Sequence, residues 1–256
     1  MARSHELGDG VSDRITDAVV LIIPTLNEAA SIGAAVGSIP RDVVKRIIVA
    51  DGGSSDNTAA CATAAGAEVL DVGPGYGRAC LLATQAATDA DIVVFMDGDG
   101  ADDTQSIRSL VDPIRSGAAD FVIGSRVRGE REPGSMSWHQ IAAGTLAGFG
   151  MKLLYGVQYT DMCAFRAIRR DVLLGLGMSE MTYGWNIEMQ MRAARSGLRI
   201  LEIPVPYHRR TAGSSKVAGS FRGTLRAGVR IVSTFIRVSI QTAPQRHPKQ
   251  EPQGEA

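Results

Sequence analysis

The chain has 256 residues, 45% of them hydrophobic, which suits one large α/β domain or two small ones with a full core. Its 27 basic and 27 acidic side chains give a formal net charge of zero, which excludes a global field that would steer it to nucleic acid. It shows no secretion signal, no paired cysteines and no apolar run of about 20 residues. We therefore expect a reducing compartment, with the protein soluble or at most lying on a membrane surface.

Five short apolar runs are expected to be strands, with helices between them. The runs lie at 19–23, 46–50, 67–70, 91–96 and 120–125. The first helix is expected to begin at Asn27, the second to be capped by Asp56 or Asn57 and closed by Gly66, and two more to cover about 78–88 and 107–114. This alternation predicts an α/β fold with a Rossmann-like, doubly wound, mostly parallel sheet.

The second half of the chain is less regular. We expect helices at about 138–155 and 185–196, a loop at 159–170 and a strand within 198–205. The domain is expected to span 18–215, followed by a basic amphipathic segment at 216–240, with disordered ends at 1–17 and 241–256. Arginines at 222, 226 and 230 lie beside an apolar stripe, a pattern typical of a helix that lies on a membrane or packs on its own domain.

Polar segments follow three of the expected strands. They read PTLNE after the first strand, DGGSSDNT after the second and DGDGADD after the fourth. Because the carboxyl ends of parallel strands meet at one edge of a sheet, where such folds bind ligands, these segments should form one crevice.

Asp97 and Asp99 flank Gly98 directly after the fourth expected strand. Two carboxylates at this spacing can reach one ion, and their hard oxygens suit Mg²⁺ or Mn²⁺. The alternative is a solvated acidic turn in which Asp102 or Asp103 caps the next helix. An EF-hand fits less well, because its sixth position requires glycine and is Asp102 here.

Asp51 ends the second expected strand and is followed by two glycines and Ser54. Gly53 allows a close backbone approach or a positive φ. By itself this segment indicates only a tight turn with a helix cap, but beside DGDGADD it indicates a nucleotide pocket. The glycines at 73, 75 and 77 do not form a dinucleotide fingerprint, because the position that requires glycine is Arg78.

Basic side chains could bind phosphates at such a pocket. Arg126 follows the fifth expected strand, Arg166 lies in the 159–170 loop, and Arg210 and Lys216 bracket a glycine- and serine-bearing loop that could close over phosphates. Arg169 and Arg170 are interpreted as surface ion-pair residues.

Seven motifs in order resemble family 2 glycosyltransferases of the GT-A fold, and most of all the polyprenyl-phosphate (dolichyl-phosphate) mannosyl- and glucosyltransferases. They are IIPTLNE, VADGGSSDNT, FMDGDG, GSRVRG, DMCAFRAIRR, YGWNIEMQMRAA and RRTAGSSK, within residues 19–237. The resemblance implies a single GT-A domain with a basic C-terminal helix. The sequence has Ala101 where the mannosyltransferases usually carry glutamine, and it differs from many relatives at Cys163. Many relatives also carry C-terminal membrane spans, which this sequence is not expected to form.

The resemblance also implies roles for particular residues. Asp97 and Asp99 would hold Mg²⁺ or Mn²⁺ on the diphosphate, and Glu188 would lie near the sugar or acceptor. Asp99, Arg126, Arg166, Glu188, Arg210 and Lys216 would form the catalytic set. The nucleotide-sugar would be held by Pro24, Thr25, Asn27, Glu28, Asp51, Gly53, Ser54, Asp97 and Gly98.

The implied reaction is the metal-dependent, inverting transfer of glucose or mannose from a UDP- or GDP-sugar to a polyprenyl phosphate. The enzyme would work peripherally at the cytoplasmic face of the membrane. A soluble acceptor, such as a phosphorylated small acid, is an alternative; a hydroxyl acceptor would need a carboxylate base, and Glu188 or Asp161 would be the candidates. A non-catalytic nucleotide-sugar-binding protein is a third possibility.

Overall fold

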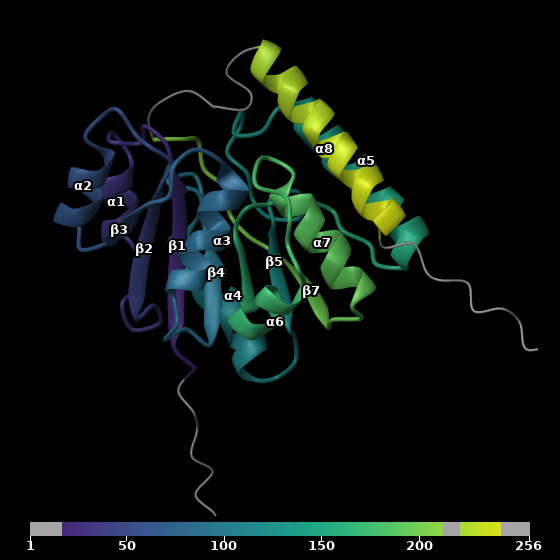
Figure 1. Ribbon diagram of the computed structural model, residues 1–256, viewed down its shortest axis with the longest axis horizontal. Coiled ribbons are helices and arrows are strands. Elements are labelled where there is room, and N and C mark those ends of the chain that lie inside the picture. Colours follow the sequence, from purple (N-terminus) through teal and green to yellow (C-terminus); the bar gives the residue numbers. More distant parts are fainter. Residues whose placement is uncertain (1–16, 212–220, 242–256) are drawn as a thin grey trace, which may run out of the picture.

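The computed structural model describes residues 17–211 and 221–241. The expectations for residues 1–16, for residues 242–256 and for Lys216 therefore fall outside the described residues. The strands are β1 (Val19–Thr25), β2 (Arg46–Asp51), β3 (Glu68–Asp71), β4 (Ile92–Phe95), β5 (Phe121–Ser125), β6 (Arg166–Arg169) and β7 (Ile200–Pro204). They form one sheet in the order β3-β2-β1-β4-β6-β5-β7 (Figure 1).

The sheet is mostly parallel, as expected, with β6 as the exception. β6 runs antiparallel between β4 and β5, pairing Ile168 with Val93 on one side and with Phe121 on the other. This strand was predicted to be part of a loop, which is wrong. Its sequence is RAIR, in which two arginines flank Ala167 and Ile168, and this is too short an apolar run to predict burial between two strands.

Helices cover the sheet and extend from one of its ends (Figure 1). They are α1 (Ile32–Gly37), α2 (Thr58–Ala64), α3 (Tyr76–Ala86), α4 (Ile107–Arg115) after the short 3₁₀ helix η1 (Thr104–Ser106), α5 (Trp138–Tyr155), α6 (Arg170–Gly175), α7 (Trp185–Arg195) and α8 (Phe221–Gln241). The apolar face predicted for α4 is confirmed, since Ile107, Leu110, Val111 and Ile114 are all buried.

The first helix was predicted to begin at Asn27, but it begins at Ile32. Asn27 has a left-handed φ of 52°, which helical residues do not adopt. Its side-chain oxygen accepts a hydrogen bond from the backbone N–H of Ser55 (2.8 Å), and the N–H of Glu28 donates to Thr58 Oγ1 (2.8 Å). The residues before α1 are therefore held as a turn by the loop that follows β2.

The second helix begins after Asn57, one of its two expected caps. The side chain of Asn57 makes no capping bond, whereas Asp56 Oδ1 accepts from the N–H of Thr58 at 3.0 Å. Gly66 follows the helix with a φ of 89°, so the expected glycine stop is confirmed.

Two long helices, α5 and α8, lie side by side at one end of the molecule (Figure 1). A Cβ atom on Gly150 of α5 would come within 2.8 Å of the Phe235 ring of α8, so the two helices approach closely at a position where α5 has no side chain. In the described ranges, no helix combines the length and the apolar character needed to cross a membrane.

Candidate functional site

The loops after β1, β2 and β4 are bonded to one another at the carboxyl edge of the sheet. Gly52 N–H donates to the Thr25 carbonyl (2.8 Å), and Thr25 Oγ1 donates to Asp51 Oδ1 (3.4 Å). Ser31 Oγ donates to the Gly98 carbonyl (2.9 Å), and a Cβ on Gly98 would lie 2.9 Å from a Thr25 methyl carbon. The predicted meeting of the three polar segments is therefore confirmed.

Asp51 organises the loop that follows β2. Its carboxylate accepts from Ser54 Oγ and from the Ser54 N–H (2.9 Å), and Ser54 Oγ in turn accepts from the N–H of Asn27 (2.8 Å). Gly53 adopts a φ of 89°, a conformation that glycine tolerates best. These residues form one bonded rim, next to Pro24 and Thr25 at the end of β1.

Three carboxylates crowd the turn after β4. Asp99 and Asp102 are buried, Asp99 Oδ1 accepts from Ala101 N–H (3.0 Å), and Asp102 Oδ2 accepts from Asp97 N–H (3.2 Å). Burial, with the nearby charge of Asp99, raises the pKa of Asp97 to about 6. Burial and the charge of Asp97 also raise the pKa of Asp102 well above its usual range. Such a cluster is stable in its charged form only beside cations.

The donor set of this turn suits a divalent metal ion. Oxygen atoms of Asp97 and Asp99 are hard ligands of the kind that Mg²⁺ and Mn²⁺ prefer. Within the described residues, no three His, Cys, Asp or Glu side chains are already arranged around one metal position. An ion at Asp97 and Asp99 would therefore complete its coordination with water or substrate oxygens, as Mg²⁺ commonly does.

Residues 207–211 lie over the acidic turn. The N–H of His208 donates to the Ala101 carbonyl (2.9 Å), and Thr211 donates to the Asp99 carbonyl through both its N–H (3.2 Å) and its Oγ1 (3.0 Å). Arg210 Nη2 lies 3.1 Å from Asp99 Oδ2. Arg210 is thus brought to the expected metal ligand, whereas the rest of its loop, with Lys216, lies outside the described residues.

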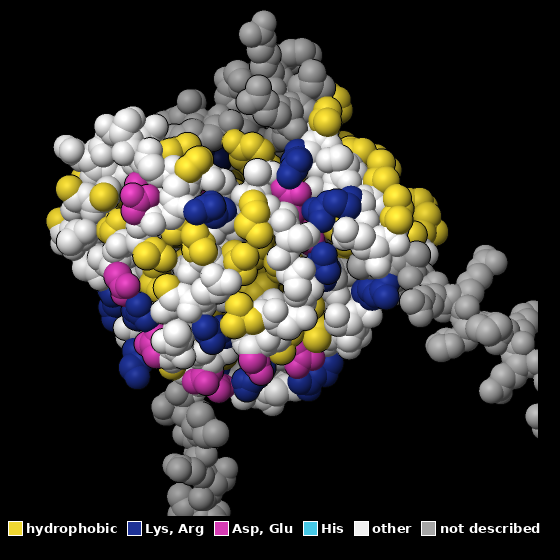
Figure 2. All heavy atoms as spheres, viewed as in Figure 1, with side chains coloured by type: hydrophobic (Ala, Val, Ile, Leu, Met, Phe, Trp, Pro, Cys, Tyr) yellow, Lys and Arg dark blue, Asp and Glu magenta, His cyan; other side chains and the backbone are white. Residues whose placement is uncertain are grey.

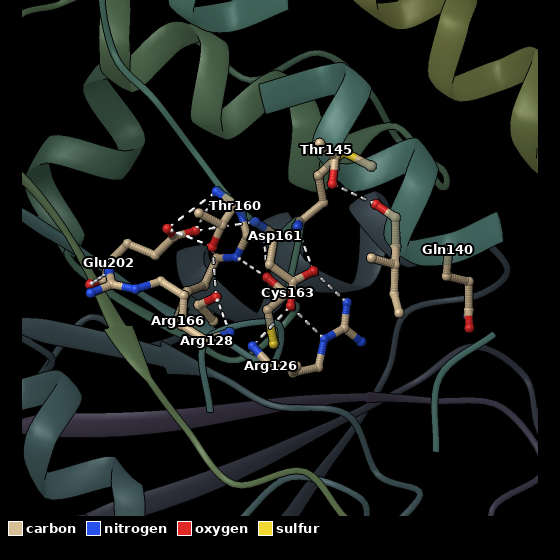
Figure 3. A network of polar contacts seen from close by, with 12 residues as sticks. Arg126, Arg128, Gln140, Thr145, Thr160, Asp161, Cys163, Arg166 and Glu202 are labelled. Atoms are coloured by element: carbon tan, nitrogen blue, oxygen red, sulfur yellow. Dashed lines mark hydrogen bonds and ion pairs between the residues drawn. The ribbon is translucent and has the colours of Figure 1, made fainter. Parts of the chain in front are cut away.

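Arg126 provides the second cation of the site. Its Nε and Nη2 atoms donate to the two oxygens of Asp161, each at 2.8 Å (Figure 3). Its guanidinium carbon lies 5.0 Å from the centre of the Tyr207 ring. Its charge counteracts the rise in the pKa of Asp97. Burial raises the pKa of Asp161, but the bonds from Arg126 outweigh it and hold that pKa below the usual range.

The structure does not bring Arg166 to the surface of the crevice. Its side chain is fully buried, and its guanidinium donates to the carbonyl oxygens of Cys163 and, at 3.1 Å, of Asn186. The guanidinium carbon also lies 5.8 Å from the centre of the Phe121 ring. Arg166 is therefore engaged with the protein itself and presents no donor to a bound phosphate.

Glu188 is also fully buried and fully engaged. Its carboxylate accepts from the N–H groups of Ser179 (3.0 Å) and Glu180 (2.6 Å), and it pairs with Arg192 one helical turn later (2.9 Å). These bonds fix the segment before α7, and the carboxylate of Glu188 does not face the acidic turn. The resemblance pointed to Glu188 near the sugar or acceptor, and the structure instead places it in the interior.

Asp102 and Tyr207 belong to the site but were not predicted as site residues. Asp102 lies within the DGDGADD motif and was interpreted as a possible helix cap; its place in that acidic motif could have marked it as a site residue. Tyr207 forms a β-bridge with Asp102 and lies against Arg126. No local pattern marks this tyrosine, because its contacts are with residues about 80 to 105 positions earlier in the chain.

Comparison with known proteins gives consistent results. A model of the family described as "Glycosyl transferase family 2" matches residues 20–176. An uncharacterized glycosyltransferase of Mycobacterium tuberculosis is 36% identical over 212 residues, which are 82% of this chain and 94% of that protein. The undecaprenyl-phosphate mannosyltransferase of Micrococcus luteus is 32% identical over 231 residues, covering 80% of this chain and 89% of its own.

A solved structure shares the fold. Glucosyl-3-phosphoglycerate synthase from Mycobacterium tuberculosis, in complex with Mn²⁺, UDP-glucose and phosphoglyceric acid, has a TM-score of 0.70 and 22% identity, with 90% of this chain and 82% of that one covered. The expected GT-A fold is thereby confirmed. Because the family model spans more than half of the chain, and the relatives match most of it, the chain belongs to glycosyl transferase family 2 and is a glycosyltransferase.

Proposed function

We propose that this enzyme transfers a hexose, glucose or mannose, from a UDP- or GDP-sugar to a polyprenyl phosphate, with inversion at the anomeric carbon. The observation that carries the proposal is the pairing of clustered acids with arginines. Asp97 and Asp99 lie beside Arg126 and Arg210 at the edge of the sheet. The name of the Micrococcus luteus relative, an undecaprenyl-phosphate mannosyltransferase, supports an acceptor of this class.

In the proposed reaction, the main demand on the site is to stabilise the departing nucleoside diphosphate. A Mg²⁺ or Mn²⁺ ion held by Asp97 and Asp99 would supply charge to that diphosphate. Arg210, now paired with Asp99, would be released by the cation to neutralise a phosphate. The rim built by Asp51, Ser54 and Asn27, with Pro24, Thr25 and Glu28 beside it, would hold the nucleoside.

The state of the candidate bases favours a phosphate as acceptor. A hydroxyl acceptor requires a carboxylate that can take its proton. Asp161 is held by Arg126 with a lowered pKa, and Glu188 is fully buried, so both are poor bases as placed. A phosphate monoester needs no base, because its second pKa is about 6 and its oxygen is largely ionised near neutral pH.

Since the proposed acceptor is a membrane lipid, we also propose that the enzyme works peripherally at the cytoplasmic face of the membrane. The soluble-acceptor and non-catalytic alternatives are separated from this proposal by one assay. Purified enzyme is incubated with Mn²⁺ and either labelled UDP-glucose or labelled GDP-mannose, and each donor is tested with a polyprenyl phosphate and with 3-phosphoglycerate. The proposal expects the label in the organic phase with one donor.

Label recovered only in a water-soluble product would overturn the lipid acceptor and support the phosphorylated acid. No transfer with either acceptor, combined with a donor-induced rise in melting temperature, would support the non-catalytic alternative. An Asp99→Asn variant, tested in parallel, controls for label released by a contaminating enzyme.

A further inference from the structure

Helix α8 turns an apolar stripe to the solvent. Val229, Val232, Ile236 and Ile240 recur at helical spacing, and between 54% and 73% of each side chain is exposed. A helix on the surface of a globular protein normally turns such a stripe towards the core. Another side of α8 packs on the core through buried Val238, so this stripe is a second apolar surface that the protein itself leaves uncovered.

The side of α8 that faces the protein combines apolar packing, from buried Val238 and partly buried Ile231 and Phe235, with hydrogen bonds to one buried carboxylate. Glu180, which precedes α7, is 2% exposed and accepts from Arg230 Nε (3.0 Å), Thr234 Oγ1 (3.0 Å) and Arg237 Nη2 (3.1 Å). Turning α8 to bury its apolar stripe would remove all three donors from Glu180. A buried carboxylate without partners is strongly unfavourable, so these bonds fix the outward orientation of the stripe.

Helix α5 adds a second exposed stripe. Leu146, Phe149 and Leu153 are 72%, 57% and 72% exposed, and Trp138 at the start of the helix is 79% exposed. Both α5 and α8 pack on α7, and they contact each other at Gly150 and Phe235. Their exposed stripes therefore lie together on the side away from α7. Figure 2 shows hydrophobic side chains along the edge that α8 occupies in Figure 1.

The charges of the two helices suit an anionic surface. In a chain with 27 acidic residues, neither α5 nor α8 contains a single Asp or Glu. Their ionisable side chains are Lys152, His139, Tyr155 and the arginines at 222, 226, 230 and 237, of which Arg230 and Arg237 are paired with Glu180. Apolar stripes flanked only by neutral or basic groups, with an exposed tryptophan at one end, match the interface of a bilayer that contains anionic lipids.

A pocket opens beside this face. It has a volume of about 260 Å³ and is lined by Phe149, Lys152, Thr145, Val127, Gln158 and Thr160 among others. Phe149 belongs to the exposed stripe of α5, whereas Val127 and Thr160 are the chain neighbours of Arg126 and Asp161. The apolar face is thus continuous with the surroundings of the Arg126–Asp161 ion pair.

We propose that the outer face of α5 and α8 (Trp138, Leu146, Phe149, Leu153, Val229, Val232, Ile236 and Ile240) is a bilayer-docking surface. This inference deepens the proposed function, on which it rests, because a polyprenyl phosphate must be reached from the membrane. The apolar stripe enters the interface, while Arg230 and Arg237 hold α8 to the enzyme. Attachment therefore depends on the outward apolar side chains more than on these arginines.

The test measures sedimentation of the full-length protein with vesicles of phosphatidylcholine and phosphatidylglycerol that contain no polyprenyl phosphate. The test variant is Val232→Asp with Ile236→Asp. The control variant, Ala60→Asp with Leu174→Asp, places the same charges at exposed positions of α2 and α6. We expect the wild type and the control to sediment with the vesicles, and the test variant to bind at least ten-fold more weakly.

A second measurement uses the unmodified protein, in case the test variant does not fold. Of the two tryptophans, Trp138 is exposed and Trp185 is buried, so quenching by brominated lipids reports on α5. We expect Trp138 to be quenched on vesicle binding. Absence of vesicle binding by the wild type, or unchanged binding by a folded test variant, would overturn the proposal.

Three further outcomes are also decisive. If the wild type is a dimer that the aspartates convert to a monomer, and vesicle binding does not change, the face is a contact between two copies. Wild-type enzyme that binds vesicles but transfers no sugar contradicts the proposed function and supports the docking surface. Enzyme that transfers sugar to a detergent-dispersed polyprenyl phosphate but does not bind vesicles would support the proposed function and overturn the docking surface.

Discussion

Arg210 and Asp99 form an ion pair in which Arg210 Nη2 lies 3.1 Å from Asp99 Oδ2, so the expected metal ligand is already neutralised by a side chain of a neighbouring loop. A divalent ion at Asp99 competes with this pair, and the loop that carries Arg210 is bonded to the same turn through Thr211. Metal binding and the position of Arg210 should therefore be linked.

Arg210→Ala is expected to strengthen Mn²⁺ binding in the absence of nucleotide, because Asp99 loses its internal partner. The same change should lower kcat about 100-fold, since a cation near the leaving group is lost. Arg209→Ala is the matched control, because Arg209 lies next to Arg210 in the same loop, is exposed, and donates to the carbonyl of Pro133. Calorimetry with Mn²⁺ and steady-state kinetics check the two effects, and weaker metal binding by Arg210→Ala would contradict the linkage.

Asp99→Asn keeps the shape of the side chain but removes its charge. If Asp99 holds the metal ion, transfer should fall by about 100-fold to 1,000-fold, and excess Mn²⁺ should restore part of it. The measurement is the rate of transfer as a function of Mn²⁺ concentration, with circular dichroism to confirm the fold. Undiminished transfer in the variant would rule out the role assigned to Asp99.

Asp97 should make the metal-free enzyme less stable at neutral pH than at acidic pH. Its pKa is raised to about 6, so the folded state binds a proton more tightly than the unfolded chain, whose pKa is about 3.9. The stability from this group is complete below about pH 4 and is lost as the pH rises through about 6. Asp97→Asn should therefore stabilise the metal-free protein at pH 7 by about 3 kcal/mol.

The check is urea unfolding with EDTA at pH 4.5 and pH 7, for which the variant should show the larger gain at pH 7. Mn²⁺ should raise the melting temperature of the wild type at pH 7 and not that of Asp97→Asn. Metal binding by the wild type should weaken as the pH falls below about 6, because protonation removes a ligand. An equal effect of the substitution at both pH values would contradict the raised pKa.

Arg166→Met tests whether the buried arginine serves the fold or the chemistry. Because Arg166 is fully buried and donates to two carbonyl oxygens, the change should reduce the free energy of unfolding by about 3 kcal/mol. Transfer by the fraction that remains folded should keep a KM near that of the wild type. A stable variant with a strongly raised KM for the acceptor would instead support the phosphate-binding role that the resemblance implies.

The sequence was sufficient for the elements whose apolar runs or faces are local. The all-apolar run of β1 and the spaced face of α4 each predict their element, and the polar ends of β1, β2 and β4 predicted the crevice. The sequence could not show that β6 lies between two strands, because its partners are about 45 and 75 residues away. The start of α1 depends likewise on Ser55 and Thr58 of another loop.

The same limit applies to the candidate site and to α8. Asp97 and Asp99 could be predicted from one motif, whereas the burial of Arg166 and Glu188 depends on contacts with distant segments. The two stripes of α8 were evident from their spacing, but not which of them faces the protein. The answer depends on Glu180, about 50 residues earlier in the chain, which binds Arg230 and Thr234, and on the burial of Val238 in the core.

Glu180→Gln should loosen α8. The charge that holds Arg230 and Arg237 is removed, and because these arginines are about half and one-third exposed, solvent reduces the loss of stability to about 2 kcal/mol. The matched control is Glu130→Gln, at an exposed position. Hydrogen exchange should accelerate across 228–241 in the first variant alone, while the strands keep their protection. Unchanged exchange in α8 would mean that its packing against α5 and α7 holds the helix without Glu180, and that the outward orientation of its apolar stripe has another cause.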